Sequence, residues 1–224
     1  MKNLNGKSLL LFGDSIMYGS GNNGVGVGEY LERDFGIKLY KYCVGGARVG
    51  FMQGKSWVVE QVKSAIADGV KPDLLVFDGF TNDCNMTDGQ NCDVPLGGTE
   101  ESCKELFKVN KEDSFCVCFK SIVNAFKTYF PNAKILFIRP HKMGRRGEEV
   151  QVLYGELAAE ICTQAGIAVC DLYKESGLDT FIPEHRDRYT NDSYGWGRGD
   201  CTHPNALGYE KFYMPLIEEA LYGL

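Results

Sequence analysis

The sequence predicts an α/β fold, a three-layer α/β/α sandwich around a five-stranded parallel sheet. Five short apolar runs alternate with segments whose apolar residues recur at the i, i+3, i+4 spacing of a packed helix. Such alternation gives right-handed β–α–β crossovers, which place helices on both faces of a parallel sheet. With 224 residues, 44% of them hydrophobic, the chain suffices for one sizeable core. Residues 1–224 are therefore expected to form a single domain.

The strands and helices are expected where these two patterns occur. The apolar runs predict strands at about 8–13, 38–44, 73–78, 134–139 and 167–172. Three apolar stripes predict the helices between them: Val58, Val62, Ala65 and Ile66; Phe115, Cys118, Phe119, Ile122, Val123, Phe126, Tyr129 and Phe130; Val150, Leu153, Leu157, Ala158 and Ile161. A last helix is expected from near Asn205, with these residues facing inward: Leu207, Phe212, Tyr213, Leu216, Ile217 and Leu221. Pro215 should kink or shorten that helix, because proline has no backbone N–H.

The stretch 84–113 is the main insertion into this alternating pattern. Gly89-Gln90-Asn91 and Gly97-Gly98-Thr99 within it predict surface loops. Insertions of this kind usually lie at the rim of a site and shape substrate access.

Composition and charge restrict the partners. The net charge of −6 argues against nucleic acid or an anionic membrane surface as the main partner. No apolar run approaches the ~18 residues that a membrane helix needs. Met1–Lys7 lead straight into the first strand without a secretory leader, which predicts a cytoplasmic location, although a secreted chain trimmed of its leader would start in the same way. A homo-oligomer is compatible with the sequence.

Nine cysteines, an odd number, favour reduced thiols. Cys43, Cys162 and Cys170 lie in apolar patterns and are expected to be small core residues. Five others fall between 84 and 118, where no pair has the Cys-x2-Cys spacing of a zinc site and no histidine is near. Free thiols are the main expectation for these five, with oxidised pairing and a structural metal as alternatives.

Ser15 ends the segment Leu-Leu-Leu-Phe-Gly-Asp-Ser, which places its hydroxyl just past the carboxyl end of the first strand. Far downstream, Asp200 and His203 set a carboxylate and an imidazole three residues apart. A serine hydroxyl becomes a useful nucleophile when an imidazole takes its proton and a carboxylate orients that imidazole. Because a polar turn after a strand is common, the serine motif gains its meaning from the Asp-x-x-His pair.

Two further strand ends carry groups suited to an oxyanion. The second strand runs into Gly45-Gly46, where a sharp turn exposes backbone N–H groups, and the third runs into Gly79-Phe80-Thr81-Asn82-Asp83. Backbone N–H groups and an asparagine amide are usual donors to a tetrahedral oxyanion. Ligands in an open parallel sheet bind beyond the carboxyl ends of the strands, so Ser15, Gly46 and Asn82 are expected to meet there.

The order Ser, Gly, Asn, His over nearly the whole chain resembles the SGNH hydrolases, the GDSL-like esterase and lipase superfamily. The resemblance implies a flavodoxin-like sheet of order 2-1-3-4-5 and a catalytic triad of Ser15, His203 and Asp200. It also implies an oxyanion hole made by the N–H groups of Ser15 and Gly46 and the amide of Asn82. The chemistry of the family requires no metal and no organic cofactor.

The chain departs from the family pattern in its third motif. One extra residue separates Gly79 from Asn82, which leaves two arrangements open: Asn82 donates to the oxyanion, or Thr81 or a backbone N–H takes its place. Met17 occupies the position of the second glycine in a Gly-x-Ser-x-Gly elbow, so an ordinary α/β-hydrolase is disfavoured.

Substrate contacts are predicted from residues near these motifs. Arg139 and His141 lie at the end of the fourth strand and are candidates to support or line the site. The loop 189–198 before Asp200 carries Tyr194 and Trp196, which suit the apolar faces of sugar rings or, alternatively, pin the catalytic loop. The cations of 142–146 would meet an anionic group, or form a solvated loop with Glu148 and Glu149 as counter-charges; the solvated loop is favoured.

The function these residues predict is a serine esterase for short-chain esters, with O-acetyl groups on a carbohydrate as the favoured substrate. A lipid-type or thioester hydrolase of the same family is the first alternative and would need an apolar acyl channel. A non-catalytic, phosphate-binding flavodoxin-like module is the second. It leaves Asp200, His203 and Asn82 without a role.

Overall fold

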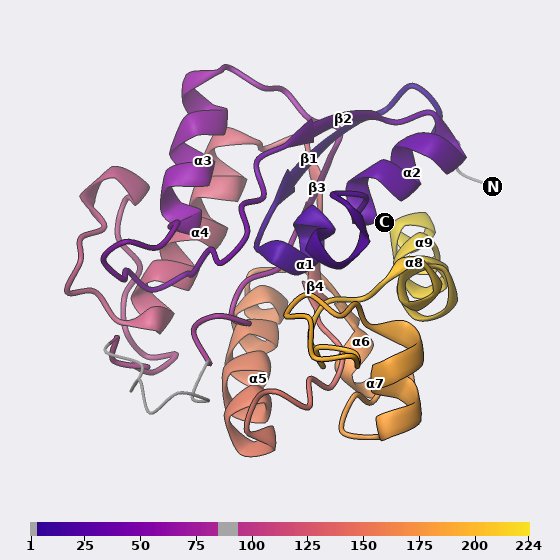
Figure 1. Cartoon of the computed structure of the whole chain (residues 1–224). Helices are drawn as coiled ribbons and strands as arrows, with labels where there is room; N and C mark the ends of the chain where they lie inside the picture. Colours follow the sequence, from indigo (N-terminus) through magenta and orange to yellow (C-terminus); the bar gives the residue numbers. More distant parts are fainter. Residues whose placement is uncertain (1–3, 85–93) are drawn as a thin grey trace.

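The computed structural model describes residues 4–84 and 94–224. One parallel sheet has the order β2-β1-β3-β4-β5, and helices cover both of its faces (Figure 1). The predicted fold class and strand order are confirmed. The five strands have these bounds: β1 Ser8–Phe12, β2 Lys38–Lys41, β3 Leu74–Phe77, β4 Lys134–Arg139 and β5 Ala168–Asp171.

Strand β1 shows how the sheet divides the core. Leu10 pairs with Tyr40 of β2 and Leu75 of β3, so β1 lies between these two strands. Because side chains alternate along a strand, Leu10 and Phe12 enter one core and Leu9 and Leu11 the other. A fully apolar strand of this kind is expected when both faces are covered.

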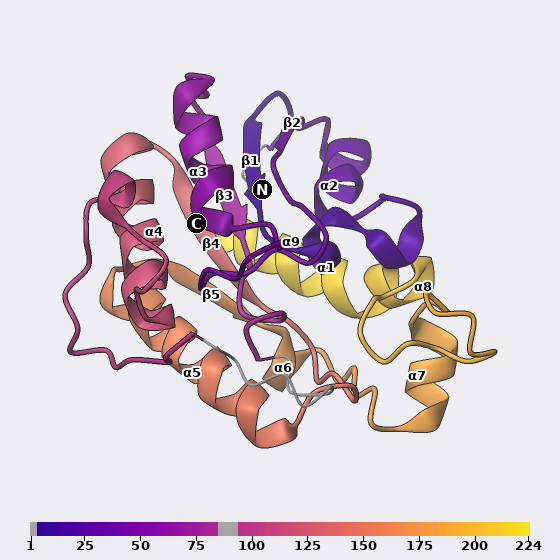
Figure 2. The same cartoon turned by 60° about the vertical axis from the view of Figure 1, so that its left-hand side comes forward.

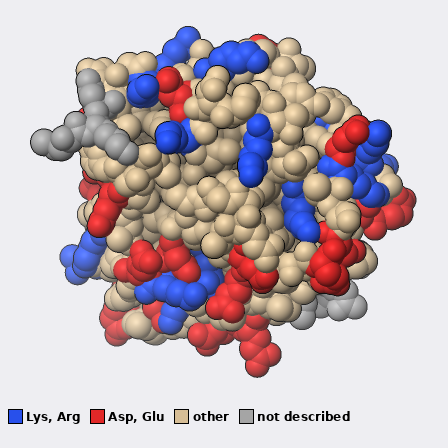
Figure 3. Space-filling model, turned by 180° about the vertical axis from the view of Figure 1, so that it is seen from behind, with Lys and Arg blue, Asp and Glu red and all other residues tan. Residues whose placement is uncertain are grey.

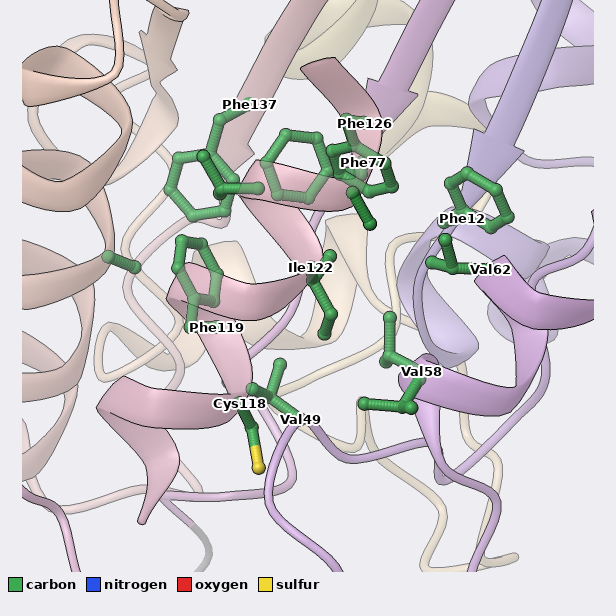
Figure 4. Close-up of a cluster of buried hydrophobic side chains, with 14 of the residues drawn as sticks. Phe12, Val49, Val58, Val62, Phe77, Cys118, Phe119, Ile122, Phe126 and Phe137 are labelled. Carbon is green, nitrogen blue, oxygen red and sulfur yellow. The ribbon is translucent and has the colours of Figure 1, made fainter. Parts of the chain in front are cut away.

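One face is covered by α3 (Val58–Ala67), α4 (Phe115–Tyr129) and α5 (Glu148–Gln164). Phe77 lies between Phe126, at 4.9 Å between ring centroids, and Phe137, at 5.1 Å (Figure 4). The predicted stripes of these helices are buried or partly buried, except that Leu153 is 49% exposed and Tyr129 is 38% exposed.

The other face is covered by α2 (Val27–Phe35) and α9 (Met214–Gly223), as the rotated view in Figure 2 also shows. The remaining short helices α1 (Ser15–Tyr18), α6 (Leu172–Glu175) and α7 (Pro183–Tyr189) lie toward the carboxyl ends of the strands.

The carboxyl-terminal helix is interrupted rather than continuous. It consists of α8 (Ala206–Gly208), a π-helical turn at Tyr209–Tyr213, and α9. Pro215 lies in the first turn of α9, directly after the π-helical turn, so the helix changes its hydrogen-bonding pattern just before the residue that lacks an N–H. The predicted inward orientation of Leu207 is wrong: its side chain is 53% exposed, because α8 is too short to bring it onto the face of α9.

The insertion is described from residue 94, and residues 85–93 lie outside the described part. Leu106 and Val109 are buried against α3 and α4, and Phe107 contacts Tyr129 at 6.2 Å between ring centroids. Residues 94–113 therefore form a wall beside α4 in addition to the surface loop at Gly97.

The cysteines described here are free, as expected. Cys43, Cys162 and Cys170 are buried core residues, and so are Cys84, Cys116 and Cys118. Burial raises the pKa of the Cys84 thiol to about 12. Cys92 lies outside the described residues.

Within the described ranges, no helix is both long and apolar enough to cross a membrane. Lys and Arg side chains are interspersed with Asp and Glu on the face opposite to that of Figure 1, with acidic side chains denser along its lower edge (Figure 3). This face therefore carries side chains of both charges.

Candidate active site

Ser15 is the first residue of α1, directly beyond the carboxyl end of β1. Asp14 caps this helix: its Oδ1 accepts a 2.8 Å hydrogen bond from the Ile16 N–H. Lying in the first turn, the Ser15 N–H has no acceptor within the helix. The side chain of Gln61 holds Gly13, two residues before Ser15. It accepts from the Gly13 N–H at 3.0 Å and donates to the Gly13 carbonyl at 2.9 Å.

The structure brings Ser15, His203 and Asp200 together in one hydrogen-bonded row. The Ser15 Oγ lies 2.8 Å from His203 Nε2, and His203 Nδ1 lies 2.6 Å from Asp200 Oδ2. Asp200 Oδ1 accepts from the N–H groups of Thr202 and His203 at 2.9 and 2.8 Å. Burial raises the pKa of Asp200, but the hydrogen bonds and charge of His203 outweigh it, so the pKa lies below the usual value.

The loop that carries His203 is held by close backbone contacts. Cys201 adopts a left-handed conformation with φ 65°, which bends the chain so that Asp200 can reach the two N–H groups beyond it. The Asn191 N–H donates to the His203 carbonyl at 2.9 Å. Gly21 packs against this loop, and a Cβ there would lie 2.5 Å from the Pro204 carbonyl oxygen. Only glycine fits at that contact.

Two neighbouring carboxyl groups lie beneath the serine. Asp14 and Asp78 are both buried, and Asp78 Oδ1 accepts from the Asp14 N–H at 3.1 Å. Burial raises the pKa of Asp14, and burial together with the Asp14 charge raises the pKa of Asp78 well above its usual value. Asp78 was not singled out from the sequence, where it reads as the last residue of an apolar strand.

Gly46 lies in a tight turn after β2. The Ala47 N–H donates to the Val44 carbonyl at 3.1 Å, and Gly46 has φ 75° at the third position of this turn. A positive φ at that position is the geometry that favours glycine. Within residues 4–84 and 94–224, no group accepts a hydrogen bond from the Gly46 N–H. The turn therefore leaves this N–H available.

Asn82 points toward the serine loop despite the extra residue in its motif. Its Nδ2 donates to the Ala47 carbonyl at 2.9 Å and lies 3.4 Å from Asp14 Oδ2. Ala47 follows Gly46 in the chain, and Asp14 precedes Ser15. The amide thus lies between the serine loop and the glycine turn.

Asp83 fixes the backbone that follows the glycine turn. Its carboxylate accepts from the Val49 and Gly50 N–H groups at 3.0 and 2.8 Å. Burial raises the pKa of Asp83 to about 6, even though these hydrogen bonds and the Arg48 charge lower it. This residue too was missed as a site support by reasoning from the sequence.

Asp83→Asn tests this support through the pH dependence of stability. Because the pKa of Asp83 is higher in the folded than in the unfolded chain, its contribution to stability is largest below about pH 4 and falls as the pH rises to about 6. The amide of the variant does not titrate. The stability of the wild type relative to the variant should therefore fall by ~2–3 kcal/mol between pH 4 and 7, as measured by urea unfolding. An unchanged difference would contradict the buried carboxyl assignment.

His141 lies behind the triad. It is fully buried, with Nδ1 2.6 Å from the Tyr213 hydroxyl, and within the described part of the chain its Nε2 has no hydrogen-bond partner. Burial lowers the pKa of His141 to about 3, against the charge of Asp200, which raises it. His141 is therefore a neutral, buried imidazole that packs behind the triad and does not line the surface where a substrate would bind.

Arg139 does not line an open part of the site. It is fully buried beside α5, its Nη1 donates to Asp171 Oδ2 at 3.2 Å, and its guanidinium carbon lies 4.5 Å from the Tyr173 ring centroid. A Cβ on Gly155 would lie 2.5 Å from Arg139 Nε, so the helix approaches this side chain closely. The structure therefore assigns Arg139 to packing between β4, β5 and α5.

Tyr194 and Trp196 form an exposed stacked pair, with ring centroids 4.7 Å apart and about half of each residue accessible. Asp192 pins their loop, because its carboxylate accepts from the Trp196 and Gly197 N–H groups at 2.6 and 2.7 Å. The loop is thus held by Asp192, while both aromatic residues stay about half exposed.

Arg145 and Arg146 contradict the interpretation of their loop as a solvated one. Arg146 is 6% exposed and its Nε donates to the Thr81 carbonyl at 3.0 Å. Arg145 lies over the Tyr194 ring, 4.1 Å from the centroid. Among the described residues, neither guanidinium forms an ion pair with Glu148 or Glu149.

Within the same described ranges, no three His, Cys, Asp or Glu side chains cluster closely enough to hold a metal ion. What the site offers is a hydroxyl next to an imidazole, an ionised carboxylate behind that imidazole, and N–H donors at two neighbouring loops. Such an arrangement can take a proton from the serine, stabilise the resulting imidazolium and hold a developing oxyanion.

A sequence model of the GDSL-like Lipase/Acylhydrolase family matches residues 11–211. This range includes all the motifs described above. A search of curated proteins finds no match for the chain.

Solved structures with the same fold cover nearly the whole chain. A protein from Lactobacillus plantarum is 18% identical with a TM-score of 0.72, over 98% of this chain and 96% of that one. A lipase/acylhydrolase from Enterococcus faecalis is 16% identical with a TM-score of 0.61, over 97% and 96%. An acetyl xylan esterase from Geobacillus stearothermophilus is 18% identical with a TM-score of 0.58, over 98% and 97%.

Proposed function

Because the chain belongs to the GDSL-like lipase/acylhydrolase family and is a carboxylic ester hydrolase, we propose that it is a serine esterase that removes short acyl groups, above all acetyl, from a carbohydrate. The observation that carries the mechanism is the row from Ser15 Oγ through His203 to Asp200, with distances of 2.8 and 2.6 Å. The matching acetyl xylan esterase structure supports the choice of substrate.

In the first step His203 Nε2 takes the proton as Ser15 Oγ attacks the ester carbonyl. The imidazolium then carries N–H groups on both nitrogens, and Asp200 stabilises it through Nδ1. Because the pKa of Asp200 is lowered, this carboxylate is ionised at neutral pH. His203 next gives the proton to the leaving alcohol. In the second half of the reaction His203 takes a proton from the attacking water and gives it to Ser15 Oγ as the acyl group leaves.

Three donors are proposed for the oxyanion: the N–H groups of Ser15 and Gly46, and the Asn82 amide. The first two have no acceptor in the described structure. Asn82 makes one firm bond to the Ala47 carbonyl, whereas its 3.4 Å contact with Asp14 is long. The N–H that makes the long contact is the one that a stronger, charged acceptor would draw away.

Two aromatic surfaces suit a sugar as the alcohol part. The first is the stacked pair Tyr194–Trp196 on the loop before Asp200. The second is a groove of about 560 Å³ whose wall includes Val44, next to the glycine turn. Aromatic and polar residues both line this groove: Tyr42, Val44, Phe51, Lys55, Ser56, Trp57, Glu60, Gln61, Ser64 and Lys111.

A panel of p-nitrophenyl esters from acetate to decanoate, run beside acetylated xylan and an acetyl thioester, tests this proposal. We expect kcat/KM to be highest for acetate and to fall with chain length, and acetate to be released from xylan. A maximum at octanoate or decanoate would favour a lipid-type hydrolase, and a preference for the thioester would favour a thioesterase. Either result would contradict the proposed substrate.

Asn82→Ala tests the oxyanion assignment. We expect kcat to fall by ~10²–10³ with KM little changed, because the hydrogen bond from the Asn82 amide strengthens only as charge builds on the carbonyl oxygen of the substrate. Asn124→Ala, on the exposed side of α4, is the matched control and should keep wild-type kcat. A loss below about tenfold at Asn82 would assign the third donor to another group.

A further inference from the structure

Arg146 carries a buried charge that has no carboxylate partner in residues 4–84 and 94–224. Only 6% of the residue is exposed; its Nε donates to the Thr81 carbonyl, and its Nη1 has no hydrogen-bond partner among the described residues. A buried guanidinium is costly unless its N–H groups are paired, so one that keeps a free N–H next to a site is suited to an incoming acceptor.

Arg145 adds a second guanidinium beside it. Its guanidinium carbon lies 4.1 Å from the Tyr194 ring centroid and 5.2 Å from the Trp196 ring centroid. Its Nη1 is also buried and, within the described ranges, without a partner. Among the described residues these two neighbouring like charges form no ion pair, which favours an anionic group on the substrate.

Both cations adjoin the proposed catalytic groups. Thr81, which Arg146 contacts, precedes Asn82, and the charge of Arg146 acts on Asp14 beside Ser15. Arg145 stacks on the aromatic pair that we assign to the sugar. A group held by the two arginines would therefore lie beside the aromatic pair, on the side that the proposed function assigns to the alcohol part.

We propose that the substrate is an ester whose alcohol part carries a carboxylate, such as an acetylated acidic sugar, and that Arg145 and Arg146 bind this carboxylate. The proposal rests on the esterase function proposed above. A carboxylate matches the planar N–H groups of a guanidinium and forms strong charge-assisted hydrogen bonds with it. Local cations are needed for such a substrate, because the net charge of the chain, −6, would otherwise repel it.

The test compares 4-acetoxybenzoate with 4-acetoxybenzamide, two acetates of similar shape that differ in the charge of the alcohol part. The wild type should prefer the benzoate in kcat/KM, and the preference should weaken at high salt. Arg146→Gln and Arg145→Gln should each lower kcat/KM for the benzoate ~10–100-fold, mainly through KM, and leave the benzamide within about threefold. Arg188→Gln, which removes an exposed charge from α7, should change neither.

Four results would overturn the proposal. Equal losses on both acetates would make the arginines structural supports only. Losses confined to mono-p-nitrophenyl succinate, measured against p-nitrophenyl butyrate, would place the anion on the acyl side. Wild-type turnover of the benzamide without any benzoate preference would leave the esterase proposal intact and refute the anion site, whereas no turnover of any acetate would refute both. Should Arg146→Gln fail to fold, the partly exposed Arg145→Gln decides the outcome.

Discussion

Ser15→Ala and His203→Ala should each lower kcat for p-nitrophenyl acetate by ~10⁴-fold or more. The reason is geometric: the 2.8 Å contact between Ser15 Oγ and His203 Nε2 makes one unit, in which the hydroxyl has no base without the imidazole and the imidazole has no nucleophile without the hydroxyl. The measurement is kcat and KM for each variant, together with circular dichroism to verify the fold.

The double variant distinguishes a joint role from two separate ones. Since both residues act in the same step, Ser15→Ala/His203→Ala should be little worse than either single variant. Ser102→Ala, at an exposed position in the insertion, serves as a control and should retain wild-type kcat. Near wild-type turnover by Ser15→Ala would refute the nucleophile assignment.

Asp200→Asn should lower kcat by ~10⁴-fold, because the surrounding N–H groups dictate how the new amide lies. Oδ1 accepts two backbone N–H groups, so the amide oxygen must take this place. The NH₂ group then faces His203 Nδ1 and requires it to be an acceptor. The proton consequently moves to Nε2, where it prevents His203 from taking the proton of Ser15.

Asp14→Asn is the matched comparison and should be milder. Burial raises the pKa of Asp14, so the loss of its charge costs less than it would at an exposed carboxylate. The amide oxygen can still accept from the Ile16 N–H. The cost is the weak contact with Asn82, for which we expect a loss of about tenfold or less in kcat. A larger loss at Asp14 than at Asp200 would reverse the two carboxylate assignments.

The fold was predictable because both faces of the sheet leave a clear pattern. The apolar run before Gly13 is short and continuous, as expected of a strand covered on both sides, and the stripe from Phe115 to Tyr129 is long enough to indicate α4. Helix α2 was not predicted, since its residues Val27–Phe35 include four charges that blur the apolar stripe. Local patterns also indicated the three residues of the hydrogen-bonded row, because Ser15 follows a strand end and Asp200 and His203 share a short loop.

The supports of the site were not predictable, because each depends on a contact between distant segments. Gly21 matters only where it meets Pro204, and Asp83 only where it meets the N–H groups after the glycine turn. Arg146 resembles any loop cation until the fold buries it against Thr81. A charged residue shows its role through its partners, and the sequence does not place those partners beside it.

Ser15 is expected to form the covalent intermediate. Incubation with a p-nitrophenyl phosphonate, followed by intact-mass and peptide mass spectrometry, tests it most directly. We expect one phosphonyl adduct per chain, located on Ser15, that appears as esterase activity disappears and is absent from His203→Ala on the same timescale. Inactivation with the adduct on another residue, or full activity in a chain fully labelled at Ser15, would contradict the claim.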